Sequence, residues 1–137
     1  MNDFEGVIPI LNVKDLAASI DYYVNKLGFK INWESEFFSS VSRGKVSIFL
    51  CQGAQGHLGV WMSVFLKDVD ALYEEYKQSG AIIIEPPMNF PWEHREMLIG
   101  DLDGHRLRMT GDPTGPPDEG YLTTERSRSQ PQDEGSK

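Results

Sequence analysis

The chain repeats one short pattern at an interval of about fifty residues, which marks an internal duplication. The tetrad Val13-Lys14-Asp15-Leu16 is echoed by Leu66-Lys67-Asp68-Val69. Each tetrad is followed by a helical pattern that contains a tyrosine at the same offset and then reaches a glycine. These residues are Tyr23 and Gly28 in the first copy and Tyr76 and Gly80 in the second. The duplication predicts a fold made of two copies of one supersecondary unit.

Each copy predicts the same order of elements, namely one strand, one helix and three further strands. In the first copy the helix is expected over 16–27 and the strands over 7–13, 29–34, 37–42 and 45–51. In the second copy the helix is expected from Asp68 or Asp70 to Ser79, and the strands over 60–66, 81–85, 95–100 and 106–110. Pro86-Pro87 is expected to end the strand before it. The predicted fold class is α+β, with two tandem β-α-β-β-β modules at about 5–52 and 59–111.

The composition is typical of a soluble globular protein, with 39% hydrophobic and 25% charged residues. Residues 1–111 are expected to form one domain. Residues 112–137 are rich in Pro, Gly, Ser, Thr, Gln and charge, so a flexible acidic tail is expected there. No apolar stretch is long enough to span a bilayer, and the acidic N-terminus is unlike a signal peptide. A cytoplasmic location is therefore expected, without a membrane partner.

The formal net charge of −8 argues against a nucleic-acid partner, because phosphates require a cationic surface. The same charge suits a cationic small molecule. Cys51 is the only cysteine, which excludes an internal disulfide. Because it ends an apolar run, Cys51 is interpreted as a small residue of the core or of a pocket wall.

Two local motifs, together with the paired modules, resemble the glyoxalase/bleomycin-resistance/dioxygenase superfamily, also called the vicinal oxygen chelate fold. The first motif is the Val-Lys-Asp-Leu tetrad followed by Leu27-Gly28-Phe29. The second is Pro91-Trp92-Glu93-His94-Arg95-Glu96-Met97 followed by the turn Asp101-Leu102-Asp103-Gly104. The resemblance covers roughly residues 5–110. It implies that the modules form a curved open sheet around a cleft.

Metal-using members of this superfamily place histidine on the first strand of each module and a carboxylate on the last. The resemblance assigns these positions to Ile8, Trp61 and Arg108, and a fourth to the stretch 47–51, which contains no acid. These side chains are not ligands for a divalent cation, and a guanidinium repels one. No metal and no other cofactor is therefore expected.

The three histidines leave alternatives open. His57 lies in a glycine-rich linker and is interpreted as a solvated residue, while His105 is interpreted as a turn residue. His94 could line the cleft. A metal held by Glu93, His94 and Glu96 remains an alternative, although this spacing matches no known site.

Among members without a metal, the chain is most similar to the bleomycin-resistance proteins, which sequester glycopeptide antibiotics without chemical change. This resemblance implies a homodimer with two drug grooves at the subunit interface, and an N-terminal arm containing Pro9 that crosses to the partner. It implies that Trp92 stacks on a planar drug ring and that Phe38 is the facing ring. The expected ligand-binding residues are Trp33, Phe38, Cys51, Ser63, Trp92, Glu93 and Arg95. No catalytic residue is expected.

The aromatic residues also have a purely structural interpretation. A core position for Trp33 is as compatible with the pattern as a cleft position, and Phe37 and Phe38 must point opposite ways, so that one is expected in the core. Glu34, Glu36 and Glu93 lie beside the aromatic residues and would suit a cationic drug. The predicted function is antibiotic resistance by binding a cationic, planar bleomycin-type drug. The alternatives are a metal-dependent glyoxalase-like lyase or dioxygenase with relocated ligands, and a protein that binds another planar aromatic compound.

Overall fold

The computed structural model describes residues 2–119, and its first module contains the predicted order of elements. Strand β1 (Ile10–Val13) leads into helix α1 (Leu16–Asp21), which continues as a π-helical turn, η1 (Tyr22–Lys26). The side chain of Asp15 caps α1 by accepting from the Ala18 N–H. Three strands complete the module: β2 (Lys30–Glu34), β3 (Phe38–Arg43) and β4 (Val46–Gln52).

The second module repeats this order. Strand β5 (Trp61–Phe65) precedes helix α2 (Val69–Ser79), which Asp68 caps as Asp15 caps α1. Gly80 ends α2 in the left-handed conformation, with φ of 87°, which glycine adopts without a steric penalty. The remaining strands are β6 (Ile82–Phe90), β7 (His94–Gly100) and β8 (Arg106–Gly111). The predicted duplication is confirmed.

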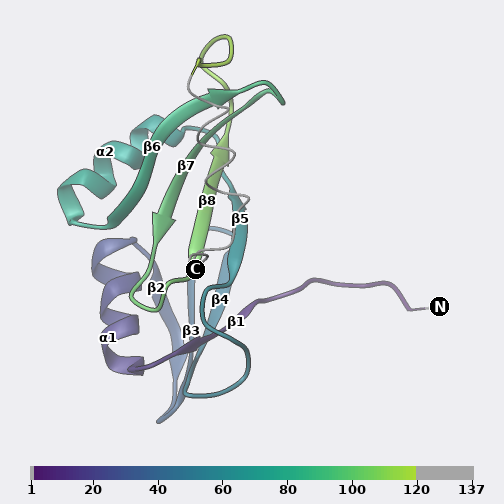
Figure 1. Cartoon of the computed structure of the whole chain (residues 1–137). Coiled ribbons are helices and arrows are strands. Elements are labelled where there is room, and N and C mark those ends of the chain that lie inside the picture. Colours follow the sequence, from purple (N-terminus) through teal and green to yellow (C-terminus); the bar gives the residue numbers. More distant parts are fainter. Residues whose placement is uncertain (1, 120–137) are drawn as a thin grey trace, which may run out of the picture.

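Each module forms its own mixed four-stranded sheet. The strand orders are β1-β4-β3-β2 and β5-β8-β7-β6, with the first pair of each sheet parallel and the others antiparallel. Both helices lie on the same side of the two sheets (Figure 1). We call the opposite side of each sheet its distal face. The predicted α+β fold with curved open sheets is confirmed.

One core extends across both modules on the helix side of the sheets. It combines Leu11, Ile48 and Leu50 of the first sheet with Ile99 and Leu107 of the second. Strand residues point alternately to the two faces, so the residues between these core positions lie on the distal faces. The core thereby fixes which side chains are available to a ligand.

Three buried tyrosines join the modules by hydrogen bonds. Tyr23 Oη donates to Asp101 Oδ2 at 2.8 Å, and Tyr76 Oη donates to the Leu27 carbonyl at 2.8 Å. Tyr22 Oη donates to the Gly100 carbonyl and accepts from a backbone N–H of β6. The two tyrosines of the repeated pattern therefore bind each module to the other.

The structure differs from the predicted elements at two places. The strand expected over 7–13 is a strand only from Ile10, and residues 2–9 form an extended arm that leaves the body (Figure 1). The strand expected to end before Pro86-Pro87 continues through both prolines to Phe90, with irregular register around them. It can do so because β6 is an edge strand, where a missing N–H breaks no ladder bond.

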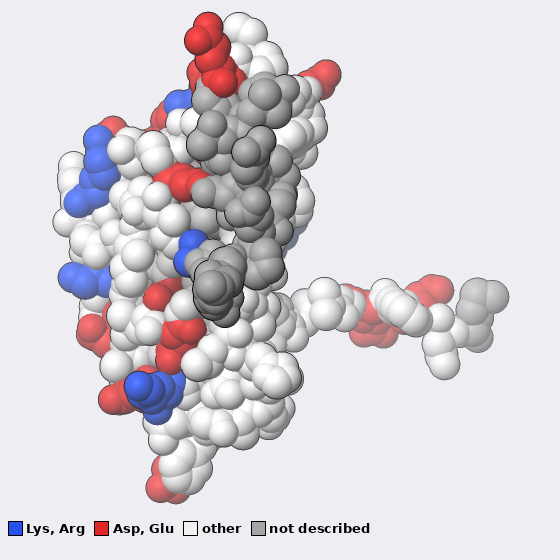
Figure 2. Space-filling model, in the orientation of Figure 1, with Lys and Arg blue, Asp and Glu red and all other residues white. Residues whose placement is uncertain are grey.

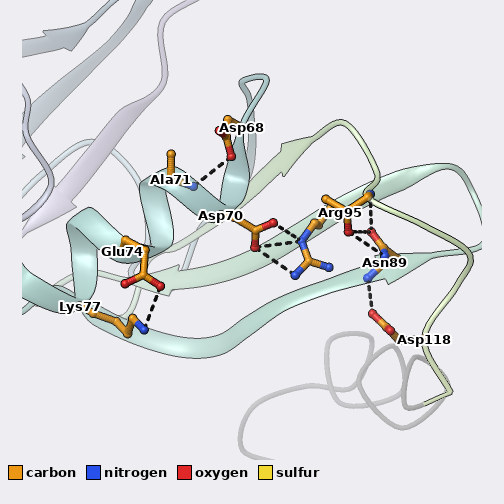
Figure 3. Close-up of polar contacts among 9 residues, drawn as sticks. Asp68, Asp70, Ala71, Glu74, Lys77, Asn89, Arg95 and Asp118 are labelled. Atoms are coloured by element: carbon orange, nitrogen blue, oxygen red, sulfur yellow. Dashed lines mark hydrogen bonds and ion pairs between the residues drawn. The ribbon is translucent and has the colours of Figure 1, made fainter.

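The beginning of the predicted tail lies against β6. Asn89 N–H donates to Asp118 Oδ2 at 2.7 Å (Figure 3). Asp118 N–H donates to the Asn89 carbonyl at 2.9 Å. The Asn89 side chain also hydrogen-bonds Thr114. The rest of the expected tail, from residue 120, lies outside the described residues. Within residues 2–119, no helix is long and apolar enough to cross a membrane.

Candidate functional site

Three aromatic rings form a cluster on the distal face of the first sheet. The Trp33 ring lies 5.7 Å from Phe38 and 5.5 Å from Phe49, and Phe38 lies 5.5 Å from Phe49, between ring centroids. Trp33 is 47% exposed. The cluster offers partly exposed apolar surface on which a flat ring can stack.

Strand alternation explains this cluster. Ile48 and Leu50 are buried in the core, so Phe49 and Cys51 between and beyond them point to the distal face. Cys51 pairs with Phe38 in the register and is buried. The structure thus brings Trp33, Phe38 and Cys51 together on one face, and Phe49 lies beside them. The predicted core position for one of Phe37 and Phe38 is wrong. Phe37 is exposed before β3 begins, and Phe38 is half-buried on the distal face.

The second sheet presents an aromatic pair at the turn between β6 and β7. The Phe90 and Trp92 rings are stacked, with centroids 4.8 Å apart and an interplanar angle of 11°. Phe90 is buried, whereas Trp92 is 41% exposed. Phe90 therefore supports one side of the indole and leaves other parts of the ring accessible.

A buried carboxylate holds the Trp92 indole in place. Trp92 Nε1–H donates to Glu96 Oε2 at 2.9 Å, and the Glu96 side chain is only 1% exposed. The other Glu96 oxygen lies 3.7 Å from Arg108 Nε, which forms an ion pair with it. A charge buried in this way requires a partner of opposite sign, and Arg108 supplies it.

The remaining predicted residues are distributed unevenly. Ser63 lies on the distal face of the second sheet, opposite Arg108 in the register. Glu93 is exposed at the β6–β7 turn, in the left-handed conformation with φ of 66°. Arg95 points to the other face, where it donates three hydrogen bonds to the Asp70 carboxylate at 3.0–3.1 Å (Figure 3). The structure does not bring Arg95 together with the other predicted residues.

A cavity of about 480 Å³ lies where the two modules meet. It is lined mainly by apolar side chains such as Val46, Val64 and Met109, with Arg43 and Lys45 beside them. None of the seven predicted ligand-binding residues lines it. The predicted residues instead lie on or beside the two distal faces, apart from Arg95.

His105 is interpreted from the sequence as a turn residue, but its side chain is buried and hydrogen-bonds to both modules. Its Nδ1 accepts from the Val60 N–H at 3.0 Å, so the ring proton is on Nε2. Nε2 then donates to the Asn12 carbonyl at 2.8 Å. Sequence offers no signal for these bonds, because both partners are backbone groups.

The three buried tyrosines that connect the modules have raised pKa values, so they ionise only at high pH. Burial raises the pKa of Tyr22 to about 12. Burial and the nearby Asp101 carboxylate raise the pKa of Tyr23 well above its ordinary value, and burial raises that of Tyr76. Burial also raises the pKa of the Asp101 carboxyl, although the hydrogen bond from Tyr23 opposes this shift.

The sequence matches the model of the Glyoxalase/Bleomycin resistance protein/Dioxygenase superfamily over residues 7–109. This range is well over half of the chain. The chain belongs to this superfamily. No significantly similar sequence is found among curated proteins.

Several solved structures share the fold. A bleomycin-binding protein from bleomycin-producing Streptomyces verticillus, complexed with copper(II)-bleomycin, is 23% identical, with a TM-score of 0.69 over 81% of this chain and 98% of that chain. A bleomycin resistance determinant encoded on the transposon Tn5 is 20% identical, with a TM-score of 0.69 over 80% and 98%. TioX from Micromonospora sp. ML1 is 22% identical, with a TM-score of 0.68 over 79% and 99%. At these identities, the similarity establishes the fold.

The superfamily positions for metal ligands do not fit a metal in this chain. Trp61 and Arg108 lie on the distal face of the second sheet, and Ile8 lies in the N-terminal arm. An indole and a guanidinium offer no lone pair to a divalent cation, and the Arg108 charge is already paired with Glu96. Within residues 2–119, no three His, Cys, Asp or Glu side chains gather where they could hold a metal ion.

Proposed function

We propose that this protein binds a bleomycin-type glycopeptide antibiotic and sequesters it without chemical change, thereby conferring resistance. The observation that carries the proposal is the pair of exposed aromatic surfaces. One surface is the Trp33–Phe38–Phe49 cluster and the other is the Phe90–Trp92 stack. Each can hold one side of a planar ring, which is the unit that such drugs carry.

The two surfaces belong to one groove only if two copies combine. They lie on different sheets of the chain, and both are on distal faces rather than in the cavity between the modules. In the proposed homodimer, the first sheet of one copy faces the second sheet of its partner. Each dimer then has two equivalent grooves, each with Phe38 on one wall and Trp92 on the other.

The N-terminal arm supports this dimer. Phe4 and Val7 are almost fully exposed, and Ile8 and Ile10 are also exposed, along an extended segment that leaves the body (Figure 1). Covering these apolar side chains with protein would remove their surface from water, which is favourable in free energy. Pro9 precedes β1, and its carbonyl accepts from the Phe49 N–H, so the arm begins beside the aromatic cluster. A partner subunit is the proposed place for this apolar surface.

Charge is compatible with a cationic ligand. The arm carries Asp3 and Glu5, and Figure 2 shows only acidic charges on it. On the body, acidic and basic side chains are interspersed along the helix side. Three exposed carboxylates, Glu34, Glu36 and Glu93, are close in sequence to Trp33, Phe38 and Trp92. Their negative charge suits the cationic tail of the proposed drug.

Tryptophan-fluorescence titration tests the proposal. Copper-free and copper-loaded bleomycin should quench the fluorescence with saturation, and the planar cation ethidium serves as a comparison ligand. Mass spectrometry of bleomycin recovered after prolonged incubation should show an unchanged mass. If neither the copper-free nor the copper-loaded form of bleomycin binds, or if the mass of the recovered drug has changed, the proposal is contradicted. Tight binding of ethidium alone would favour a different planar ligand.

A further inference from the structure

Arg108 occupies the middle of the distal face of the second sheet. Its neighbours in the sequence, Leu107 and Met109, are buried in the core, so Arg108 points the opposite way. In the register it lies between Ser63 on β5 and Leu98 on β7. Its side chain remains 33% exposed. A guanidinium is thus presented at the centre of one proposed groove wall.

The hydrogen-bonding capacity of Arg108 is incompletely used. Its buried Nε has no hydrogen-bond partner among the described residues. The nearest Glu96 oxygen, at 3.7 Å, is within ion-pair range but too far for a hydrogen bond. Glu96 therefore balances the charge while leaving a buried N–H donor unsatisfied. Unsatisfied buried donors are uncommon in native proteins. Because Nε itself is buried, a ligand would contact the exposed part of the Arg108 side chain.

The guanidinium is also close to the indole that is proposed to stack on the ligand. One carboxylate, Glu96, accepts from Trp92 with one oxygen and pairs with Arg108 through the other. A compound whose ring lies against Trp92 would therefore bring its substituents within reach of Arg108. Arginine presents several N–H groups in one plane, which match a planar acceptor such as a carboxylate or an amide carbonyl.

We propose that Arg108 binds an acceptor oxygen of the ligand, so that the groove selects planar aromatic compounds with a carboxylate or carboxamide beside the ring. This inference rests on the proposed function, because it needs the ring to stack at Trp92. It deepens that function by naming a polar anchor and the substituent that the anchor recognises. The acidic residues near the groove can still bind a cationic group elsewhere on the same ligand.

Three small probes that differ at one position test the anchor. These are quinoline-2-carboxylate, quinoline-2-carboxamide and 2-methylquinoline, titrated against the full-length protein by calorimetry. We expect at least one of the two acceptor-bearing probes to bind at least tenfold more tightly than the methyl compound. Preference for the carboxylate or for the carboxamide identifies which acceptor is recognised. In Arg108→Met this preference should disappear, while affinity for 2-methylquinoline stays unchanged.

Removing Arg108 alone leaves Glu96 as a buried unpaired charge, which can destabilise the fold. The double variant Glu96→Gln with Arg108→Met removes both charges and keeps an oxygen for Trp92, so it provides the folded test protein. Arg106→Met is the matched control, because Arg106 lies on the same face but over the Trp61 ring, at 5.6 Å. The control should keep the acceptor preference.

The outcomes separate this inference from the proposed function. Equal binding of all three probes by the wild-type protein, or an acceptor preference that survives in the double variant, overturns the role of Arg108 but leaves the ring-binding groove intact. If none of the probes binds at millimolar concentration although bleomycin binds, the role of Arg108 as an anchor for planar acceptor compounds is overturned and the proposed function stands. If bleomycin also fails to bind, both proposals are contradicted.

Discussion

Among single residues, the proposed ligand site depends on side chains that strand alternation directs to the distal faces. Strand alternation is enough to predict that Phe49 accompanies Cys51, and that Glu96 and Arg95 lie on opposite faces. It therefore gives a physical reason why Arg95 contacts Asp70 rather than the groove residues. Glu96 and Arg108 were not identifiable as partners from the sequence, because their contact depends on the register between β7 and β8.

Trp92→Ala should weaken bleomycin binding by about 1–3 kcal/mol, because one stacking surface is lost. That loss corresponds to roughly 5- to 150-fold in the dissociation constant. Calorimetric titration measures it. Phe37→Ala is the matched control, since Phe37 is an exposed aromatic residue outside both aromatic surfaces. Equal affinities for wild type and Trp92→Ala would remove Trp92 from the site.

The stability of the protein should fall as the pH rises from about 10 to 12. The pKa of Tyr22 is about 12 in the folded state and near 10 when unfolded, so the unfolded chain loses this proton first. Its stabilising contribution is complete below pH 10 and is lost as the pH passes through 12. Tyr23 and Tyr76, with their raised pKa values, act in the same direction.

Urea unfolding at several pH values between 9 and 12 measures this dependence. Tyr22→Phe should be less stable than wild type at pH 9, because it loses hydrogen bonds to Gly100 and Ile82. The gap between the two proteins should narrow as the pH rises. A constant gap over the whole range would show that Tyr22 ionisation does not contribute.

At the scale of elements, most helices and strands follow from periodicity and capping residues. Asp15 and Asp68 cap helices where predicted, and Gly80 ends one. Two elements differ from those that the sequence predicts. β6 passes through Pro86-Pro87 because it is an edge strand, and strand order is not readable from one sequence. The segment before Ile10 has strand-like composition, but its pairing with β4 begins only at Ile10, and residues 2–9 form an arm.

Deleting residues 2–8 should shift the proposed homodimer toward monomer, because the apolar arm residues that the partner would cover are then lost. Sedimentation velocity over a range of concentrations measures the change. A variant with Asp3→Asn and Glu5→Gln keeps the apolar side chains and is the control, which should remain dimeric. If the truncated and full-length chains have the same molar mass at all concentrations, the arm has no part in assembly.

At the scale of the whole molecule, the repeated tetrad was sufficient to predict two modules but not how they are joined. The tyrosines of the repeat bind backbone and side-chain groups of the opposite module, such as the Leu27 carbonyl. Backbone acceptors are present at every residue, so composition cannot reveal them. The contacts between the modules leave both distal faces on the same side of the molecule. The aromatic surfaces on these faces can therefore face a second copy.

The proposed groove combines the first sheet of one copy with the second sheet of its partner, so mixed dimers test it. Phe38→Ala and Trp92→Ala homodimers should each bind bleomycin weakly, because every groove lacks one ring. In a dimer of one Phe38→Ala chain and one Trp92→Ala chain, both substitutions fall in the same groove, and the other groove is intact. The measurement is calorimetric titration of the two variants after subunit exchange.

We predict that exchange restores tight bleomycin binding, with one intact groove in each mixed dimer and wild-type affinity at that groove. If each groove were instead made within a single chain, every groove in the mixture would still lack one ring. Binding that stays as weak as in the separate variants, despite demonstrated subunit exchange, would contradict a groove shared between two subunits.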